Sequence, residues 1–223
     1  MKRIPLSQRV LPAYSKGEEI TNMVTHIVGG AVGILVLLLC LWRSIPLATS
    51  AKIVGVSIYG GSMILLYCVS SVYHGLRPSK GKLVMQVIDH CTIYFLIVGT
   101  YTPILLVGFF PRYPLIGWGL LVMEWGLGIL AATLTAIDLK KYSIFSMICY
   151  VFMGWGIIFF LPQTIEIFSK NGFTLLLAGG LTYTVGAILY GIGAKISWVH
   201  SLFHGFVVAG SILQFLAIFL YLL

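Results

Sequence analysis

Two histidines stand four residues apart in the segment WVHSLFHGF, residues 198–206, whose other side chains are mainly apolar. Positions i and i+4 of a helix lie one turn apart on the same face, so His200 and His204 would point in the same direction. This spacing suits two imidazole ligands of one metal ion. A second motif, SSVYH, places the Ser70 hydroxyl one turn before His74, again on a common helix face.

Three neutral imidazoles with an open fourth position are the usual ligand set of a catalytic zinc ion, which lowers the pKa of bound water toward about 7. His74, His200 and His204 are therefore the candidate ligands of Zn²⁺. Asp89 is expected at a similar depth, where its carboxylate can accept a hydrogen bond from the bound water or orient a liganding ring. If the site performs hydrolysis, Asp89 is the candidate base and Ser70 a candidate group for stabilising the oxyanion.

Three further ionisable residues lie in apolar segments. His90 is rotated by about 100° from Asp89 on a helix, so the two cannot both point at one centre. For His90 and for His26, an interhelical hydrogen bond is therefore the better prediction than metal ligation. Glu124 is expected near the middle of its segment, away from the histidines, either as a proton carrier or as a carboxyl that is neutral or hydrogen-bonded to a neighbouring helix.

The composition identifies the class of protein that must position these residues. Of the 223 residues, 59% are hydrophobic and only 9% are charged, and the mean hydropathy is +1.02, which indicates a polytopic membrane protein. The net charge of +8 comes from 14 Lys and Arg scattered singly between apolar runs, a pattern typical of topology signals and not of a nucleic-acid-binding surface. The four cysteines lie in apolar runs without CxxC spacing, which argues against a disulfide framework or a thiolate metal site.

Seven apolar stretches are long enough to cross about 30 Å of hydrocarbon as helices. The fold class is therefore expected to be an all-α membrane protein, a bundle of seven transmembrane helices. Residues 1–21 are predicted to form a cytoplasmic N-terminal tail, and residues 22–223 a single transmembrane domain. The predicted spans are residues 22–42, 53–74, 84–107, 114–135, 142–161, 173–193 and 198–221.

Lysine and arginine are distributed unequally between the two sides of this bundle. Ten fall on the side of the N-terminus and four on the other side, so the positive-inside rule predicts a cytoplasmic N-terminus and an external C-terminus. At about 1.5 Å per residue, all five histidines would then share one layer on the cytoplasmic side. The ten are Lys2, Arg3, Arg9, Lys16, Arg77, Lys80, Lys82, Lys140, Lys141 and Lys195, and the four are Arg43, Lys52, Arg112 and Lys170.

The motifs also carry a resemblance to a known family. SSVYH at the end of the second predicted span, IDH early in the third and HSLFH early in the seventh resemble the progestin and adipoQ receptor family, in particular its short bacterial hemolysin III-like branch. The resemblance covers nearly the whole chain. It implies a zinc ion held by His74, His200 and His204, with Asp89 and Ser70 near the metal-bound water, in a bacterial plasma membrane. It also implies kinship with a wider superfamily that includes alkaline ceramidases, which hydrolyse a lipid amide.

Three functions are open from the sequence. The first is a zinc-dependent hydrolase of a lipid amide or ester near the inner leaflet, with membrane lipids as its partners and substrate. The second is a receptor-like protein or a sensor of membrane homeostasis, in which zinc is structural and clamps three helices. The third is an ion or proton translocator or pore, which is disfavoured because the polar residues concentrate on one side of the membrane.

Overall fold

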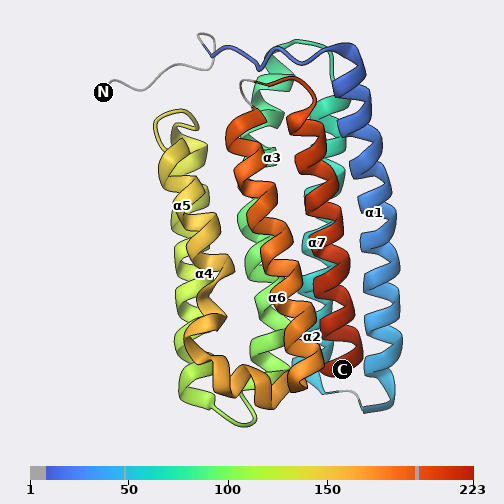
Figure 1. Ribbon diagram of the computed structural model, residues 1–223, viewed down its shortest axis with the longest axis vertical. Coiled ribbons are helices and arrows are strands. Elements are labelled where there is room, and N and C mark those ends of the chain that lie inside the picture. The colour runs from blue at the N-terminus through green and yellow to red at the C-terminus, as the bar shows by residue number, and fades with distance from the viewer. Residues whose placement is uncertain (1–8, 48, 194–195) are drawn as a thin grey trace.

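The computed structural model describes residues 9–47, 49–193 and 196–223. Within these ranges the chain is almost entirely helical and contains no strand. The longer helices stand side by side along the long axis of the molecule (Figure 1). Their bounds are α1 Lys16–Ser44, α2 Ser50–Gly75, α3 Lys80–Pro103, α4 Pro114–Ile137, α5 Ser143–Gly154, α6 Leu161–Gly193 and α7 Val199–Tyr221, with the short helices η2 Ile45–Leu47, η3 Ile104–Phe109 and η4 Gly156–Phe160.

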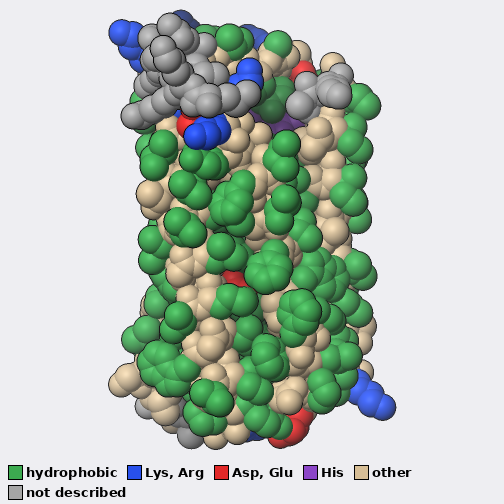
Figure 2. Space-filling view, turned by 90° about the vertical axis from the view of Figure 1, so that its left-hand side faces the viewer, with side chains coloured by type: hydrophobic (Ala, Val, Ile, Leu, Met, Phe, Trp, Pro, Cys, Tyr) green, Lys and Arg blue, Asp and Glu red, His purple; other side chains and the backbone are tan. Residues whose placement is uncertain are grey.

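Six helical stretches in the described ranges are long and apolar enough to cross a membrane. Hydrophobic side chains cover the side of the bundle, whereas Lys, Arg, Asp and Glu are concentrated near its two ends (Figure 2). The chain is therefore a multi-pass helical membrane protein. The six stretches are Lys16–Ser44, Ser50–Gly75, Lys80–Phe109, Pro114–Ile137, Ser143–Gly193 and Val199–Tyr221.

The number of apolar helical stretches among the described residues is six, where seven separate spans were predicted. The predicted spans 142–161 and 173–193 belong to one helical stretch of 51 residues, Ser143–Gly193. The polar segment predicted as a loop between them is helical because it is amphipathic and buries side chains such as Phe168 against the bundle. Ser169 departs from helical geometry with φ 60° and ψ 172°. In Figure 1 this stretch descends as α5, bends at the lower end and rises again as α6.

The first helix begins at Lys16, earlier than predicted and inside the segment assigned to a tail. The reason is a capping box at its N-terminus. The Ser15 hydroxyl accepts a hydrogen bond from the Glu18 backbone N–H at 3.2 Å, and the Glu18 carboxylate accepts one from the Ser15 N–H at 2.8 Å. Two backbone donors that a helix start leaves unsatisfied are thereby paired, so the helix can begin before the apolar run does.

The starts of two helices and the C-terminus mark opposite ends of the bundle. α1 and α7 both begin at the upper end in Figure 1, and the chain terminates at the lower end. The assignment of the upper end to the cytoplasm stays a prediction from the count of cations. Three of the ten cations in that count, Lys2, Arg3 and Lys195, lie outside the described residues.

Close approach of α1 to α2 depends on a glycine. A Cβ atom added at Gly60 would lie 2.6 Å from Cβ of Leu37 and 2.9 Å from its Cα. Small residues allow helix backbones to approach in a membrane, where packing supplies much of the association energy. Farther along the same pair of helices, the start of α1 lies beside the end of α2, where Glu19 contacts His74.

Candidate metal centre

Three histidine side chains converge at the upper end of the bundle. His74 lies in the last turn of α2, and His200 and His204 lie in the first two turns of α7. All three are buried, and one ring nitrogen of each lies within 4.8 Å of the others. Nε2 of His200 and Nε2 of His204 are 3.2 Å apart. The structure therefore brings together the imidazoles that the sequence predicted as ligands, and this triad could hold a metal ion.

A hydrogen-bonded group below the triad fixes α2 against α7. The Tyr67 hydroxyl, two turns from His74, lies 2.6 Å from Oγ of Ser211, two turns from His204. Ser211 also lies 2.7 Å from the hydroxyl of Tyr183 on α6, and Tyr67 donates to the Val207 carbonyl. Polar groups buried in a membrane bundle need such partners. The network holds the two ligand-bearing helices in register.

The Glu19 carboxylate orients His74. Its Oε2 lies 2.7 Å from Nδ1 of His74, and its Oε1 accepts a hydrogen bond from Nζ of Lys82 at 2.5 Å. Lys82 is also buried and donates to the Leu76 carbonyl at 2.9 Å. A carboxylate only accepts, so Nδ1 of a neutral His74 carries the proton and Nε2 has the lone pair.

Nε2 of His74 is buried and has no hydrogen-bond partner among the described residues. An unpaired buried nitrogen lone pair facing two other imidazoles fits a metal ion. A carboxylate on the far nitrogen of a liganding histidine is the common arrangement in zinc sites. Sequence reasoning missed Glu19 because it assigned this part of the chain to the tail. The available signal was the spacing of Glu19, Asn22 and His26, which repeats at helical intervals.

The start of α7 is tied to the start of α1. Oε1 of Glu18 accepts a hydrogen bond from the backbone N–H of Trp198 at 2.7 Å, and Trp198 has a left-handed backbone with φ 66°. On the other side, a Cβ atom at Gly193 would lie 2.9 Å from the backbone nitrogen of His200. The close approach of Gly193 to the His200 backbone therefore requires glycine, and Glu18 holds Trp198 at the start of the helix that carries His200.

Asp89 and Ser70, the two residues assigned by the sequence to the surroundings of the metal, lie beside the triad. Ser70 is buried one turn before His74 on α2, and Asp89 is on α3 with 15% of its side chain exposed. The Asp89 carboxyl lies within interaction range of the Ser70 hydroxyl and of the His74 and His90 rings. A carboxyl and a hydroxyl thus border the imidazoles on the side that opens to a cavity.

The other two histidines differ in their contacts. His90 forms the predicted interhelical hydrogen bond, with Nε2 2.9 Å from the Tyr190 hydroxyl and Nδ1 2.7 Å from the Gln86 carbonyl. For His26 the same prediction is wrong, because neither ring nitrogen has a partner among the described residues. Its ring instead stacks on His204, with centroids 3.8 Å apart. His26 therefore supports the triad by packing.

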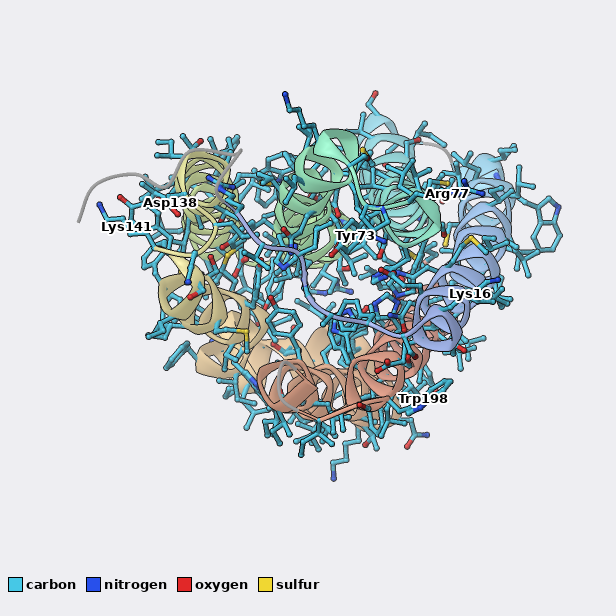
Figure 3. All side chains as sticks on the ribbon, turned by 90° about the horizontal axis from the view of Figure 1, so that it is seen from above. Lys16, Tyr73, Arg77, Asp138, Lys141 and Trp198 are labelled. Carbon is cyan, nitrogen blue, oxygen red and sulfur yellow. The ribbon has the colours of Figure 1, made fainter. Side chains whose placement is uncertain are left out.

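The segment before α1 covers the triad. It crosses the upper end of the bundle from the side of Asp138 to Lys16 (Figure 3). Tyr14 in this segment stacks on His200, with ring centroids 4.7 Å apart and an interplanar angle of 20°. Burial raises the pKa of the Tyr14 phenol above its usual value, so its hydroxyl stays neutral.

A cavity of about 1120 Å³ runs from the triad into the bundle. Its polar end is lined by His200, His204, Ser70 and Asp89. Its deeper walls come mainly from apolar side chains of α3, α5, α6 and α7, and Leu66 of α2 also contributes. A cavity of this size and polarity suits a long apolar ligand with a polar group at one end.

Glu124 lies apart from this centre. It is completely buried on α4, and neither carboxylate oxygen has a hydrogen-bond partner among the described residues. It does not line the cavity. The predicted hydrogen bond to a neighbouring helix is therefore not found in the described part of the chain. A proton carrier and a neutral carboxyl both stay predictions.

The chain is similar to known proteins over most of its length. A family model described as Haemolysin-III related matches residues 14–215. Hemolysin-3 from Bacillus cereus is 37% identical over 206 residues, which cover 92% of each chain. The Hemolysin-3 homolog of Bacillus subtilis (strain 168) is 36% identical over 204 residues, covering 92% of this chain and 94% of its own. The Adiponectin receptor protein of Drosophila melanogaster is 27% identical over 221 residues, covering 88% of this chain and 49% of its own.

Proposed function

The chain belongs to the haemolysin-III related family, a branch of the progestin and adipoQ receptors, and we propose that it is a zinc-dependent hydrolase of a lipid amide or ester. The observation that carries the proposal is the buried triad of His74, His200 and His204 at the polar end of an apolar cavity. The reaction would take place near the cytoplasmic leaflet of a bacterial plasma membrane. Membrane lipids would be both its surroundings and its substrate.

The donor set supports zinc as the metal. Three neutral imidazoles are typical of catalytic zinc, and thiolate ligands are absent from the described surroundings of the triad. His74 would bind through Nε2, since its Nδ1 is engaged by Glu19. The chemistry that zinc supplies when bound is Lewis acidity toward a carbonyl oxygen and toward water.

Asp89 would carry the proton transfers, and Ser70 would stabilise the oxyanion. The Asp89 carboxylate accepts a proton from the water that attacks the acyl carbonyl carbon, while the Ser70 hydroxyl donates a hydrogen bond to the oxygen that becomes negative. The carbonyl carbon then loses its bond to nitrogen or oxygen. Asp89 returns the proton to the departing amine or alkoxide, and the products are a fatty acid and an amine or alcohol.

The remaining contacts would organise this reaction. Glu19 keeps His74 in one tautomer and one orientation, so that less reorganisation is needed during the reaction. The apolar walls of the cavity hold the acyl chain and exclude water from it. Tyr14 covers the outer face of His200 and limits access from the aqueous side.

A structural zinc clamp is the second candidate, and one observation favours it. The triad joins α2 to α7, and Glu18 and Glu19 tie α1 to the same two helices, so an ion here would fasten three helices. A receptor-like or homeostatic role would suit such a clamp. A pore is a weaker candidate because the polar lining of the cavity gathers at its upper end.

The substitution Asp89→Asn separates the two candidates. In a hydrolase the variant should retain about one zinc per chain, while release of fatty acid from a panel of acyl amides and esters should fall about 10²- to 10⁴-fold. The panel should include ceramide, and zinc should be measured on the same samples by elemental analysis. If wild type with full zinc releases no fatty acid from any member of the panel, the hydrolase proposal is wrong and the clamp is favoured.

A further inference from the structure

Two cations line the cavity away from the triad. Arg9 precedes α1, and its Nη2 donates to the Ile137 carbonyl at the end of α4 at 3.4 Å. This contact places it beside the turn between α4 and α5, which carries Lys140, and both cations line the cavity. Within the described ranges neither forms an ion pair, and Nε of Arg9 is buried without a hydrogen-bond partner.

The acidic residue of this turn is already engaged. Asp138 is buried, and its Oδ1 accepts a hydrogen bond from the backbone N–H of Lys141 at 3.1 Å. In Figure 3, Asp138 and Lys141 lie on one side of the bundle end, whereas Lys16 and Trp198 lie on the opposite side. Trp198 precedes α7, the helix that carries His200 and His204 of the triad. The polar end of the cavity thus has imidazoles with the carboxylates of Glu18 and Asp89 on one side, and on the other two cations without an ion pair among the described residues.

From this arrangement we propose that the cavity takes acyl amphiphiles with an anionic headgroup, and that Arg9 and Lys140 bind the anion. The anion is a carboxylate or a phosphate located beyond the carbonyl that faces the triad. The guanidinium of Arg9 offers a planar set of donors suited to both anions, and Lys140 adds a point charge. Cleavage of the bound lipid rests on the proposed function, but binding of the anion does not.

Physical chemistry favours an anionic occupant over a neutral one. A guanidinium donor that is buried without a partner costs free energy, which an anionic acceptor in the cavity would recover. The apolar walls below require a hydrocarbon chain on the same molecule. Neutral lipids such as ceramide satisfy the second requirement only.

Two matched pairs of ligands test the proposal. N-acylglycine and N-acylethanolamine share an amide and an acyl chain. The first ends in a carboxylate and the second in a hydroxyl. Lysophosphatidate and monoacylglycerol form the corresponding ester pair with a phosphate. Equilibrium dialysis of each radiolabelled lipid against the purified full-length protein in neutral detergent measures binding, with and without a zinc chelator.

We expect wild type to bind at least one anionic member about tenfold more tightly than its neutral partner, the worth of one charge-assisted hydrogen bond. The preference should shrink at high salt and disappear in the Arg9→Gln, Lys140→Gln double variant. The control is Arg112→Gln, Lys170→Gln, which removes the same charge from two exposed residues that do not line the cavity. Melting temperatures of both double variants identify any loss of folding, in which case the single variants are compared.

The results of the binding experiment test the anion site independently of the proposed lipid hydrolysis. Equal binding of charged and neutral partners by wild type, or a preference that survives in folded Arg9→Gln, Lys140→Gln, overturns the headgroup assignment even if lipids are cleaved. A preference lost only in that variant supports the assignment even if no lipid is cleaved. The carboxylate and phosphate pairs show which anion is the better ligand.

Discussion

The substitution Glu19→Gln tests whether this carboxylate prepares the triad for a metal. In wild type, Glu19 lies 2.7 Å from Nδ1 of His74 and 2.5 Å from Nζ of Lys82. Glutamine has one acceptor oxygen and one NH₂ group at the same positions, so it can accept from only one of these two donors. Either the tautomer of His74 is no longer fixed, or the Lys82 ammonium loses its hydrogen bond to Glu19.

The magnitudes of the two effects follow from the surroundings. Loss of a hydrogen-bonded carboxylate behind a liganding histidine weakens metal binding about 10- to 100-fold, or about 1.4 to 2.7 kcal/mol. Separation of a buried ion pair costs about 3 to 5 kcal/mol of folding stability. Here the cost should be at the lower end, because the Glu19 side chain is 20% exposed and Lys82 keeps the Leu76 carbonyl as an acceptor.

A second substitution separates metal binding from stability. Lys82→Met removes the buried ammonium, so the double variant Glu19→Gln, Lys82→Met should recover much of the lost stability but none of the lost zinc affinity. Zinc affinity is measured by competition with a chelator of known strength, and stability by melting of the metal-free proteins in detergent. Glu166→Gln is the matched control, because Glu166 contacts Tyr113 and not the triad. A zinc affinity of Glu19→Gln within twofold of wild type would refute the reasoning.

Three further predictions concern the site, its helices and their orientation. Replacement of any triad histidine by alanine should remove most of the one zinc expected per chain in elemental analysis, whereas His26→Ala should retain it, because His26 only packs on the triad. Gly193→Ala should lower the melting temperature by several degrees, since about 1 to 3 kcal/mol of strain arises against the His200 backbone, whereas Gly191→Ala meets open space and should be neutral. An alkaline phosphatase fused to the C-terminus should be active outside the cytoplasm, and fusions after Ser79 or Lys141 should be inactive; the reverse pattern would overturn the orientation.

Local patterns predicted the helices and the pair His200 and His204, whereas His74 joined the predicted triad through its matched depth and the family resemblance. Long apolar runs specify membrane helices, and the spacing of His200 and His204 puts their rings on one face of a helix wherever that helix packs. The bend at Ser169 was missed because a short amphipathic helix at a membrane surface has the composition of a polar loop. Glu19 was missed for a different reason. Its partners, His74 and Lys82, come from two other helices, so its role depends on packing that no local pattern records.

The charges around the triad give an independent argument for a divalent ion. Three carboxylates interact with its histidines, since Glu18 faces His200, Glu19 contacts His74 and Asp89 faces His74. One buried ammonium, that of Lys82, lies among them. Counted as ionised, these groups leave a formal charge of −2 at one end of a membrane bundle, where unbalanced charge is costly. A bound dication would offset this local charge beside the imidazoles. The carboxylates of Glu19 and Asp89 are therefore suited to partner an ion held by the triad, whereas Glu18 also caps α1.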